Sequence, residues 1–163
     1  LTAWGQAANS YLQTILVLQK RTVRLMHFVQ FQDHAVPFFL SSNIMPLPML
    51  YFQRVSSLMH DINNNVVPPN ISNLFTLTQD FHHYNTRSST SGNFYMNYSR
   101  LNHHKNSFSI IGAKIWNSIP KELRQLPKHK LNKKINKLLF QILKNQDSYA
   151  DLDTIIKEMK KHR

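Results

Sequence analysis

Residues 128–144 read KHKLNKKINKLLFQILK, and this stretch carries the clearest structural signal in the chain. Its apolar residues recur at steps of three and four, at Leu131, Ile135, Leu138, Leu139, Ile142 and Leu143. Lysines take the other side, at Lys130, Lys133, Lys134, Lys137 and Lys144. This pattern predicts an amphipathic α-helix with an apolar face packed on the domain. A membrane-surface helix is the rival interpretation, disfavoured because the helix has no Trp anchor and its apolar stripe is needed for packing.

Positive charge extends beyond this helix and is concentrated in the second half of the chain. The 163 residues include 20 Lys+Arg and 8 Asp+Glu, which gives a net charge of +12. Residues 1–80 hold four bases and three acids, whereas residues 81–163 hold sixteen bases and five acids. Tyr and Asn residues are interleaved with these bases, and such side chains stack on or hydrogen-bond to nucleotides. A polyanion is therefore the first partner to consider, with a merely solvated lysine face as the alternative.

Weaker periodic signals elsewhere predict a mainly α fold, a small helical domain with an irregular polar middle segment. We expect helices over residues 12–29, 37–42, 48–62 and 120–126, in addition to residues 128–144. A last helix is expected from Ser148, with Ser148 and Asp151 at capping-box spacing. Residues 80–106 are rich in His, Asn, Ser and Thr and form the irregular segment, and residues 93–98 and 107–111 are candidates for one short β-hairpin.

Several classes of functional site are disfavoured by composition. The chain has no Cys, which excludes disulfides and thiolate-ligated zinc, and its three Gly leave no Gly-rich phosphate loop. The adjacent His pairs at residues 82–83 and 103–104 point apart on regular structure. Asp151 and Asp153 are separated by Leu152 at a predicted helix start, which favours a helix cap over a magnesium-binding pair. We therefore expect no catalytic residue, metal site or cofactor here, and an enzyme using Asp151 and Asp153 is the least favoured hypothesis.

Short sequence blocks follow one another in order along residues 1–143. The first half contains Trp4-Gly5, LQKRTVR at residues 18–24, His34 with PFF at residues 37–39, and IMPL at residues 44–47. The second half contains HYNTR at residues 83–87, NSF at residues 106–108 and GAKIWNSIP at residues 112–120, followed by the lysine-rich helix. This combination resembles the region after the polymerase core in non-LTR (LINE-type, jockey-like) retrotransposon reverse transcriptases. Residues 145–163 have no counterpart in that family.

The resemblance implies the C-terminal, thumb and post-thumb part of an RNA-directed DNA polymerase. Residues 1–80 would be a thumb-like helical segment, residues 81–144 a basic post-thumb segment, and residues 145–163 a C-terminal helix outside the resemblance. Because residue 1 is Leu, we expect the chain to be cut from something longer. The implied partners are the missing upstream catalytic palm, with its magnesium ions, and RNA or an RNA–DNA hybrid, with no membrane. The implied location is an intracellular ribonucleoprotein, nuclear or cytoplasmic.

Candidate contacts to the nucleic-acid backbone come from both halves of the chain. They are Lys20, Arg21, Arg24, Tyr84, Arg87, Lys114, Lys130, Lys133, Lys134 and Lys137. For each of them, ordinary solvation or loop capping is the competing interpretation. The alternative function is a non-catalytic protein-interaction domain from a degenerate or repurposed retroelement. The wide apolar arc of residues 12–29 motivates it, because such a helix packs on more than one side.

Overall fold

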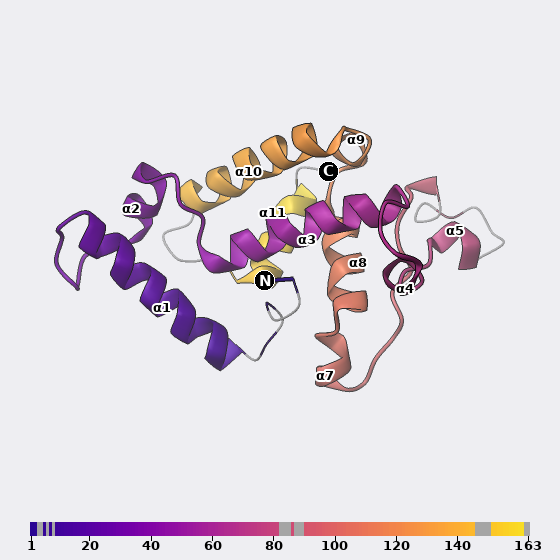
Figure 1. The fold of residues 1–163 in the computed structure, drawn as a ribbon, viewed down its shortest axis with the longest axis horizontal. Helices are drawn as coiled ribbons and strands as arrows, with labels where there is room; N and C mark the ends of the chain where they lie inside the picture. Colours follow the sequence, from indigo (N-terminus) through magenta and orange to yellow (C-terminus); the bar gives the residue numbers. More distant parts are fainter. Residues whose placement is uncertain are drawn as a thin grey trace.

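The computed structural model describes residues 1–2, 5, 7, 9–81, 86, 90–145 and 151–161. These residues form a mainly helical fold, as the sequence predicts, in which an isolated antiparallel bridge joins Leu77 and Phe94. Figure 1 shows the longer helices arranged around a central one. The helices are α1 (Asn9–Met26), α2 (Val36–Ser41), α3 (Leu47–Asn63), α4 (Pro69–Ser72), α5 (Thr78–Phe81), α7 (Asn102–Lys105), α8 (Phe108–Ser118), α9 (Lys121–Arg124), α10 (Lys128–Asn145) and α11 (Leu152–Lys161).

Helix α3 is the centre of the fold, and α1, α8, α10 and α11 all pack against it. Pro48 stands in its first turn, where the missing N–H costs no hydrogen bond, and Pro46 is its N-cap residue. Its side chains Phe52, Val55 and Met59 are fully buried. Because buried residues from α3, α8, α10 and α11 belong to one cluster, the segments 1–80, 81–144 and 145–163 share one hydrophobic core.

Helix α10 confirms the prediction for residues 128–144 to within one residue at its C-terminal end. Leu131, Ile135 and Leu139 are fully buried, as its apolar period requires. The lysines of the opposite side are exposed. Burial of these aliphatic side chains on α3 is therefore what fixes the direction in which the lysines point.

Helix α8 crosses α3 at a point where a glycine is needed. A Cβ atom at Gly112 would lie 2.9 Å from Met59 Sδ and 3.1 Å from the Phe75 ring, so a larger residue would push the elements apart. Ile115 and Trp116 complete the buried side of α8.

The start of α8 shows why the expected β-hairpin between residues 93–98 and 107–111 is wrong. The apolar residues after Ser107 repeat with a helical period, so residues 108–111 begin α8 instead of pairing with residues 93–98.

The segment 93–95 finds a different partner. Thr78 N donates to Asn93 O at 2.8 Å, and Tyr95 N donates to Thr76 O at 2.8 Å. These two hydrogen bonds flank the bridge between Leu77 and Phe94. Residues 93–95 therefore pair with residues 76–78, which precede them in the sequence, and not with residues 107–111, which follow them.

The boundaries of the first and last helices differ from the prediction. Helix α1 ends at Met26, three residues before expectation, and Phe28 follows with a left-handed backbone (φ 52°). Helix α11 begins at Leu152, and Asp151 Oδ1 accepts a hydrogen bond from Thr154 N at 2.9 Å. Asp151 is therefore the capping residue, which corrects the expected start at Ser148. Ser148 itself lies outside the described residues.

Candidate nucleic-acid interface

Five exposed lysines line the outer side of α10, and we call them the α10 lysine ridge. They are Lys130, Lys133, Lys134, Lys137 and Lys144. Steps of three, four and seven residues keep them on one side of the helix, directly opposite Leu131, Ile135 and Leu139. At 1.5 Å per residue, the ridge extends about 21 Å. In B-DNA that length corresponds to about six phosphates of one strand.

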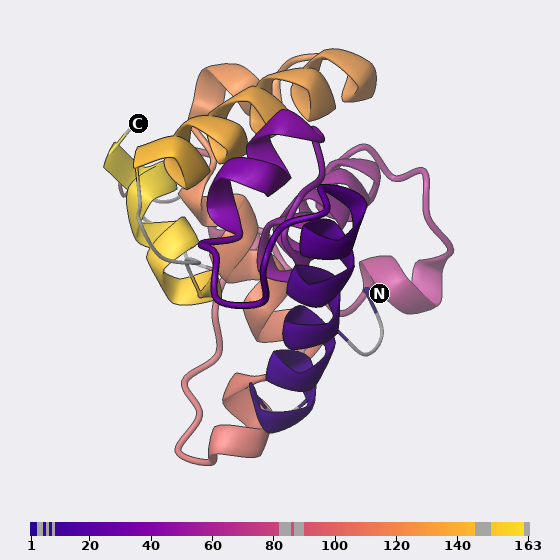
Figure 2. The same cartoon turned by 90° about the vertical axis from the view of Figure 1, so that its left-hand side faces the viewer.

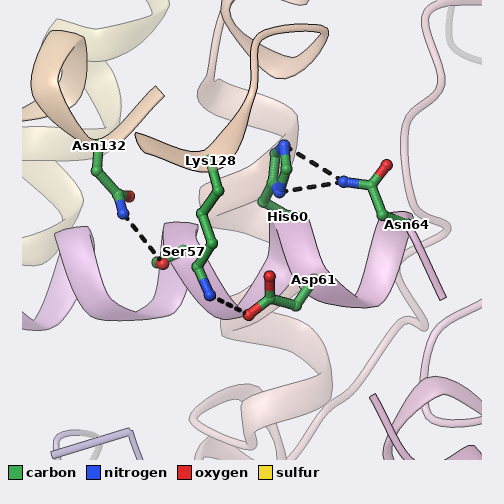
Figure 3. Close-up of polar contacts among 6 residues, drawn as sticks. All are labelled: Ser57, His60, Asp61, Asn64, Lys128 and Asn132. Atoms are coloured by element: carbon green, nitrogen blue, oxygen red, sulfur yellow. Dashed lines mark hydrogen bonds and ion pairs between the residues drawn. The ribbon is translucent and has the colours of Figure 1, made fainter. Parts of the chain in front are cut away.

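Polar contacts between α10 and α3 hold the ridge in this orientation (Figure 3). Lys128 Nζ forms an ion pair with Asp61 Oδ2, and Asn132 Nδ2 lies 3.4 Å from Ser57 Oγ. One turn of α3 away from Ser57, His60 Nε2 donates to the Leu126 carbonyl at 2.9 Å, just before α10 begins. These contacts lie on the side of α10 that faces α3, so they prevent the helix from rotating its lysines inward.

The ridge is electrostatically uncompensated within the described residues. Helix α10 contains no Asp or Glu. The ion pairs found in the described ranges are Lys114–Asp153, Lys128–Asp61 and Lys161–Glu158, and none of them involves a ridge lysine. Five like charges within about 21 Å repel one another at low salt, and a phosphate polymer would relieve that repulsion.

The three candidate bases of α1 occupy a different place. Helix α2 packs against both α1 and α10 and lies between them (Figure 2). Arg21 and Arg24 hold their guanidinium carbons 5.5 and 5.6 Å from the Phe31 ring centroid, and Arg24 Nε donates to Asp33 O at 2.7 Å. Burial, with a smaller contribution from Arg24, lowers the pKa of Lys20. The structure thus groups Lys20, Arg21 and Arg24 with one another and not with the ridge.

The remaining candidates do not extend the ridge. Lys114 Nζ lies 2.6 Å from Asp153 Oδ1, so its charge is paired across the contact between α8 and α11. Tyr84 and Arg87 lie outside the described residues. Lys144 belongs to the ridge although the candidate set omitted it. Its spacing of seven residues from Lys137 was the signal that could have included it.

A buried arginine that sequence reasoning missed organises the loop at residues 91–93. Arg124 is 7% exposed, and its Nε donates to Ile119 O at 2.8 Å. Its Nη1 reaches the carbonyls of Ser91 and Gly92 and lies 2.9 Å from Asn93 Oδ1. The guanidinium also lies 5.5 Å from the centroid of the Trp116 ring. Arg124 therefore serves the fold, and its charge is not presented to a partner.

Two cavities that open on the surface are lined by described residues. One, of about 670 Å³, is lined by residues that include His60, Asn64, Trp116 and Arg124, near the start of α10. The other, of about 580 Å³, is lined by α1, α3, α8 and α11 and includes Tyr51. In the part of the chain that the structure describes, no group of three or more His, Asp and Glu side chains could hold a metal ion. Within the same ranges, no helix combines the length and apolarity needed to cross a bilayer.

Comparison with known proteins identifies no relative of the chain. No protein-family model, curated protein or solved structure matches the chain.

Proposed function

We propose that this domain binds the sugar–phosphate backbone of RNA or an RNA–DNA hybrid through the α10 lysine ridge. The observation that carries the proposal is the alignment of five exposed lysines on a helix without acidic residues. Contacts of this kind neutralise phosphates and release counterions, so they do not discriminate between sequences of the polymer. Binding, and not catalysis, is the activity that we propose for the isolated chain.

We further propose that the chain is the C-terminal part of a non-LTR retrotransposon reverse transcriptase. The ordered sequence blocks of residues 1–143 support this origin. Under this proposal the catalytic palm and its magnesium ions belong to an upstream part of the polymerase, and the complete ribonucleoprotein is intracellular, nuclear or cytoplasmic. The α10 lysine ridge would then hold template or hybrid beside the catalytic domain.

A charge-neutralising variant of the ridge tests the binding proposal. Lys133, Lys134 and Lys137 are replaced together by Gln, which keeps helix propensity nearly unchanged. Each phosphate contact with a single strand contributes about 0.7 to the salt slope, so losing three lowers the slope by about 2. At about 0.1 M salt the affinity for a single-stranded RNA falls on the order of 100-fold.

The matched control replaces Arg54, Arg100 and Lys160 by Gln. These exposed bases lie off the ridge, and their removal changes the net charge by the same amount. The control is expected to bind RNA within a few-fold of the unmodified chain, and both variants should keep their helical circular dichroism. Equal losses in the two variants, or RNA binding that does not change with salt, would contradict the proposal.

A protein-interaction domain is the second candidate function, because one observation favours it. Helix α1 exposes a row of large apolar side chains, among them Leu18, Leu25 and Met26. Apolar surface of this extent on one helix is typical of a face that another polypeptide covers. This function does not compete with RNA binding, since α1 and the α10 lysine ridge lie on either side of α2.

A further inference from the structure

Helix α1 has two apolar sides, of which the fold uses one. Leu16 and Val23 are buried on the side that packs against α3. A second row runs along the solvent side, and we call it the α1 outer face: Tyr11, Ile15, Leu18, Thr22 and Leu25. Tyr11, Leu18 and Leu25 are 70%, 54% and 75% exposed. A core-facing stripe does not explain this second row.

The α1 outer face follows the spacing of a coiled-coil seam. Its residues are separated by steps of four, three, four and three, which is the 3.5-residue period of two helices packed along their length. Two hydroxyl groups on this side are already satisfied within the helix. Thr22 Oγ1 donates to Leu18 O at 3.0 Å and Thr14 Oγ1 to Ser10 O at 3.1 Å. The face therefore presents methyl groups and an aromatic ring with few unmet polar groups.

The two ends of the face are symmetric about Leu18, whereas Ile15 lies three residues before it and Thr22 four residues after it. Tyr11 lies seven residues before Leu18 and Leu25 seven residues after it. In an antiparallel pair of α1 helices, Leu18 of one chain would meet Leu18 of the other, and each Tyr11 would meet a Leu25. A self-complementary patch of this kind is what a twofold interface between identical chains requires.

The charges of α1 select the antiparallel arrangement. Its bases Lys20, Arg21 and Arg24 all lie in the second half of the helix, whereas residues 9–19 carry no charge. A parallel pair would place each base beside its own copy. An antiparallel pair places the basic half of each helix beside the uncharged half of the other, which reduces the repulsion between two chains of net charge +12.

The exposed apolar area is sufficient for a dimer. Phe28 (96% exposed) and Phe31 follow α1 and are exposed like Tyr11, and these three rings present on the order of 400 Å². With Ile15, Leu18, Leu25 and Met26, the apolar area that α1 and the loop after it expose is on the order of 800 Å², comparable to what each partner buries in an interface of standard size. We propose that the α1 outer face binds a second copy of this chain, with the two α1 helices antiparallel and Leu18 at the twofold axis.

The proposed dimer does not depend on RNA binding, and its affinity should change with salt in the opposite direction. Raising the salt concentration from about 0.05 M to about 0.5 M screens the repulsion between two basic chains, so dimerisation should strengthen. The same change weakens a lysine–phosphate contact. Measured together, the two salt dependences show which of the two proposals fails if only one is correct.

The first experiment is sedimentation equilibrium of the full chain at about 0.5 M salt, up to a concentration of about 100 μM. We expect a concentration-dependent dimer. Leu18→Glu places two carboxylates at the axis and should weaken the dimer at least 100-fold, with unchanged helical circular dichroism. Leu74→Glu is the matched control, because Leu74 is 55% exposed and lies outside α1. A chain that stays monomeric overturns the proposal, as does a dimer equally insensitive to both substitutions, and the face then belongs to another partner.

The second experiment uses the absence of cysteine to test the orientation. Leu18→Cys should form a disulfide-linked dimer readily under mild oxidation. Leu25→Cys should not crosslink to itself, but it should crosslink when mixed with Tyr11→Cys, because these positions face each other across the antiparallel pair. Leu74→Cys is the background control. Efficient self-crosslinking of Leu25→Cys would indicate parallel helices and overturn the proposed arrangement.

Discussion

Lys128 of α10 and Asp61 of α3 form an ion pair across the contact between the two helices. The next four lysines of α10 point away from α3 and have no acidic partner within the described residues. The lysines of α10 therefore fall into two groups. Lys128 fixes the helix on the core, and the α10 lysine ridge is left for an external anion.

This division predicts different effects for two similar substitutions. Lys128→Gln should lower the free energy of unfolding by about 0.5–1 kcal/mol, because Asp61 is left partly buried without its partner. Lys133→Gln should leave the free energy of unfolding nearly unchanged, since Lys133 is exposed and has no ion pair in the described ranges. Urea denaturation of both variants and of Asp61→Asn, in a double-mutant cycle, measures the coupling. A coupling energy of zero between Lys128 and Asp61 would mean that the pair does not stabilise the helix contact.

The periodic helices were predictable because their signal is local. In residues 128–144, the 3.6-residue period alone determines which side chains are buried, and α10 forms as expected. For residues 107–111 the sequence allows a hairpin strand as well as a helix, because a short apolar run does not distinguish the two. The decisive interaction there is the close approach of Gly112 to Met59, which are 53 residues apart in the sequence and meet only in the folded chain.

The candidate site was predictable to the same extent. The ridge positions Lys130, Lys133, Lys134 and Lys137 depend only on helix geometry, so the sequence sufficed to group them. The pairing of Lys114 with Asp153 depends on how α11 packs against α8, which no local pattern encodes. The burial of Arg124 likewise depends on carbonyl groups of residues 91 and 92, which lie more than 30 residues away in sequence.

Arg124 should be among the most sensitive positions of the domain. Arg124→Lys keeps the charge but cannot reach the carbonyls of Ser91 and Gly92 together with Ile119 O and Asn93 Oδ1. Hydrogen bonds to a charged group contribute about 1.5–3 kcal/mol each, so the free energy of unfolding should fall by at least ~3 kcal/mol.

Lys121 provides the control for this prediction. Its Nζ donates to Thr90 O at 2.9 Å in the same region, but the side chain is exposed. Lys121→Gln should therefore cost less than about 1 kcal/mol. Urea denaturation compares the two, and amide hydrogen exchange at residues 91–94 should accelerate in Arg124→Lys alone. Equal costs would show that burial of Arg124 does not strengthen its contacts.

Tyr51 offers a substitution that should not destabilise the fold. Its side chain is 3% exposed, and its hydroxyl is buried without a hydrogen-bond partner among the described residues. A buried polar group in this situation opposes folding, so Tyr51→Phe should raise the free energy of unfolding by about 1 kcal/mol. Thermal and urea denaturation at neutral pH measure the change. Tyr11→Phe, at an exposed position, should have no effect on stability. A marked loss of stability in Tyr51→Phe would indicate that the hydroxyl has a favourable contact.

Tyr51 should also make the free energy of unfolding depend on pH in the alkaline range. Burial raises the pKa of Tyr51 to about 12 from its ordinary value of 10.0. Because the folded state holds the proton more tightly, the stabilisation is complete below pH ~10 and is lost as pH rises towards ~12, at up to ~1.4 kcal/mol per pH unit. The stability difference between Tyr51→Phe and the unmodified chain should therefore widen in favour of the variant over this range. A difference that stays constant between pH ~9 and pH ~11.5 would contradict the burial of this group.

Acid should weaken the stabilisation that the N-terminal cap gives α11. Asp151 Oδ1 accepts from Thr154 N, and hydrogen bonds from the side chain and backbone of Thr154, helped by Lys157, lower the pKa of Asp151. A lowered pKa in the folded state means that the stabilisation is present above the ordinary value of about 3.9 and is lost as pH falls through the folded value. Asp151→Ala should lower the free energy of unfolding by about 1 kcal/mol at neutral pH, and Asp151→Asn, which keeps an acceptor, should lower it by less. Lys160→Gln, which removes an exposed charge from the same helix, is the control. If Asp151→Asn loses as much stability as Asp151→Ala, the charge near the helix N-terminus, and not the cap, stabilises α11.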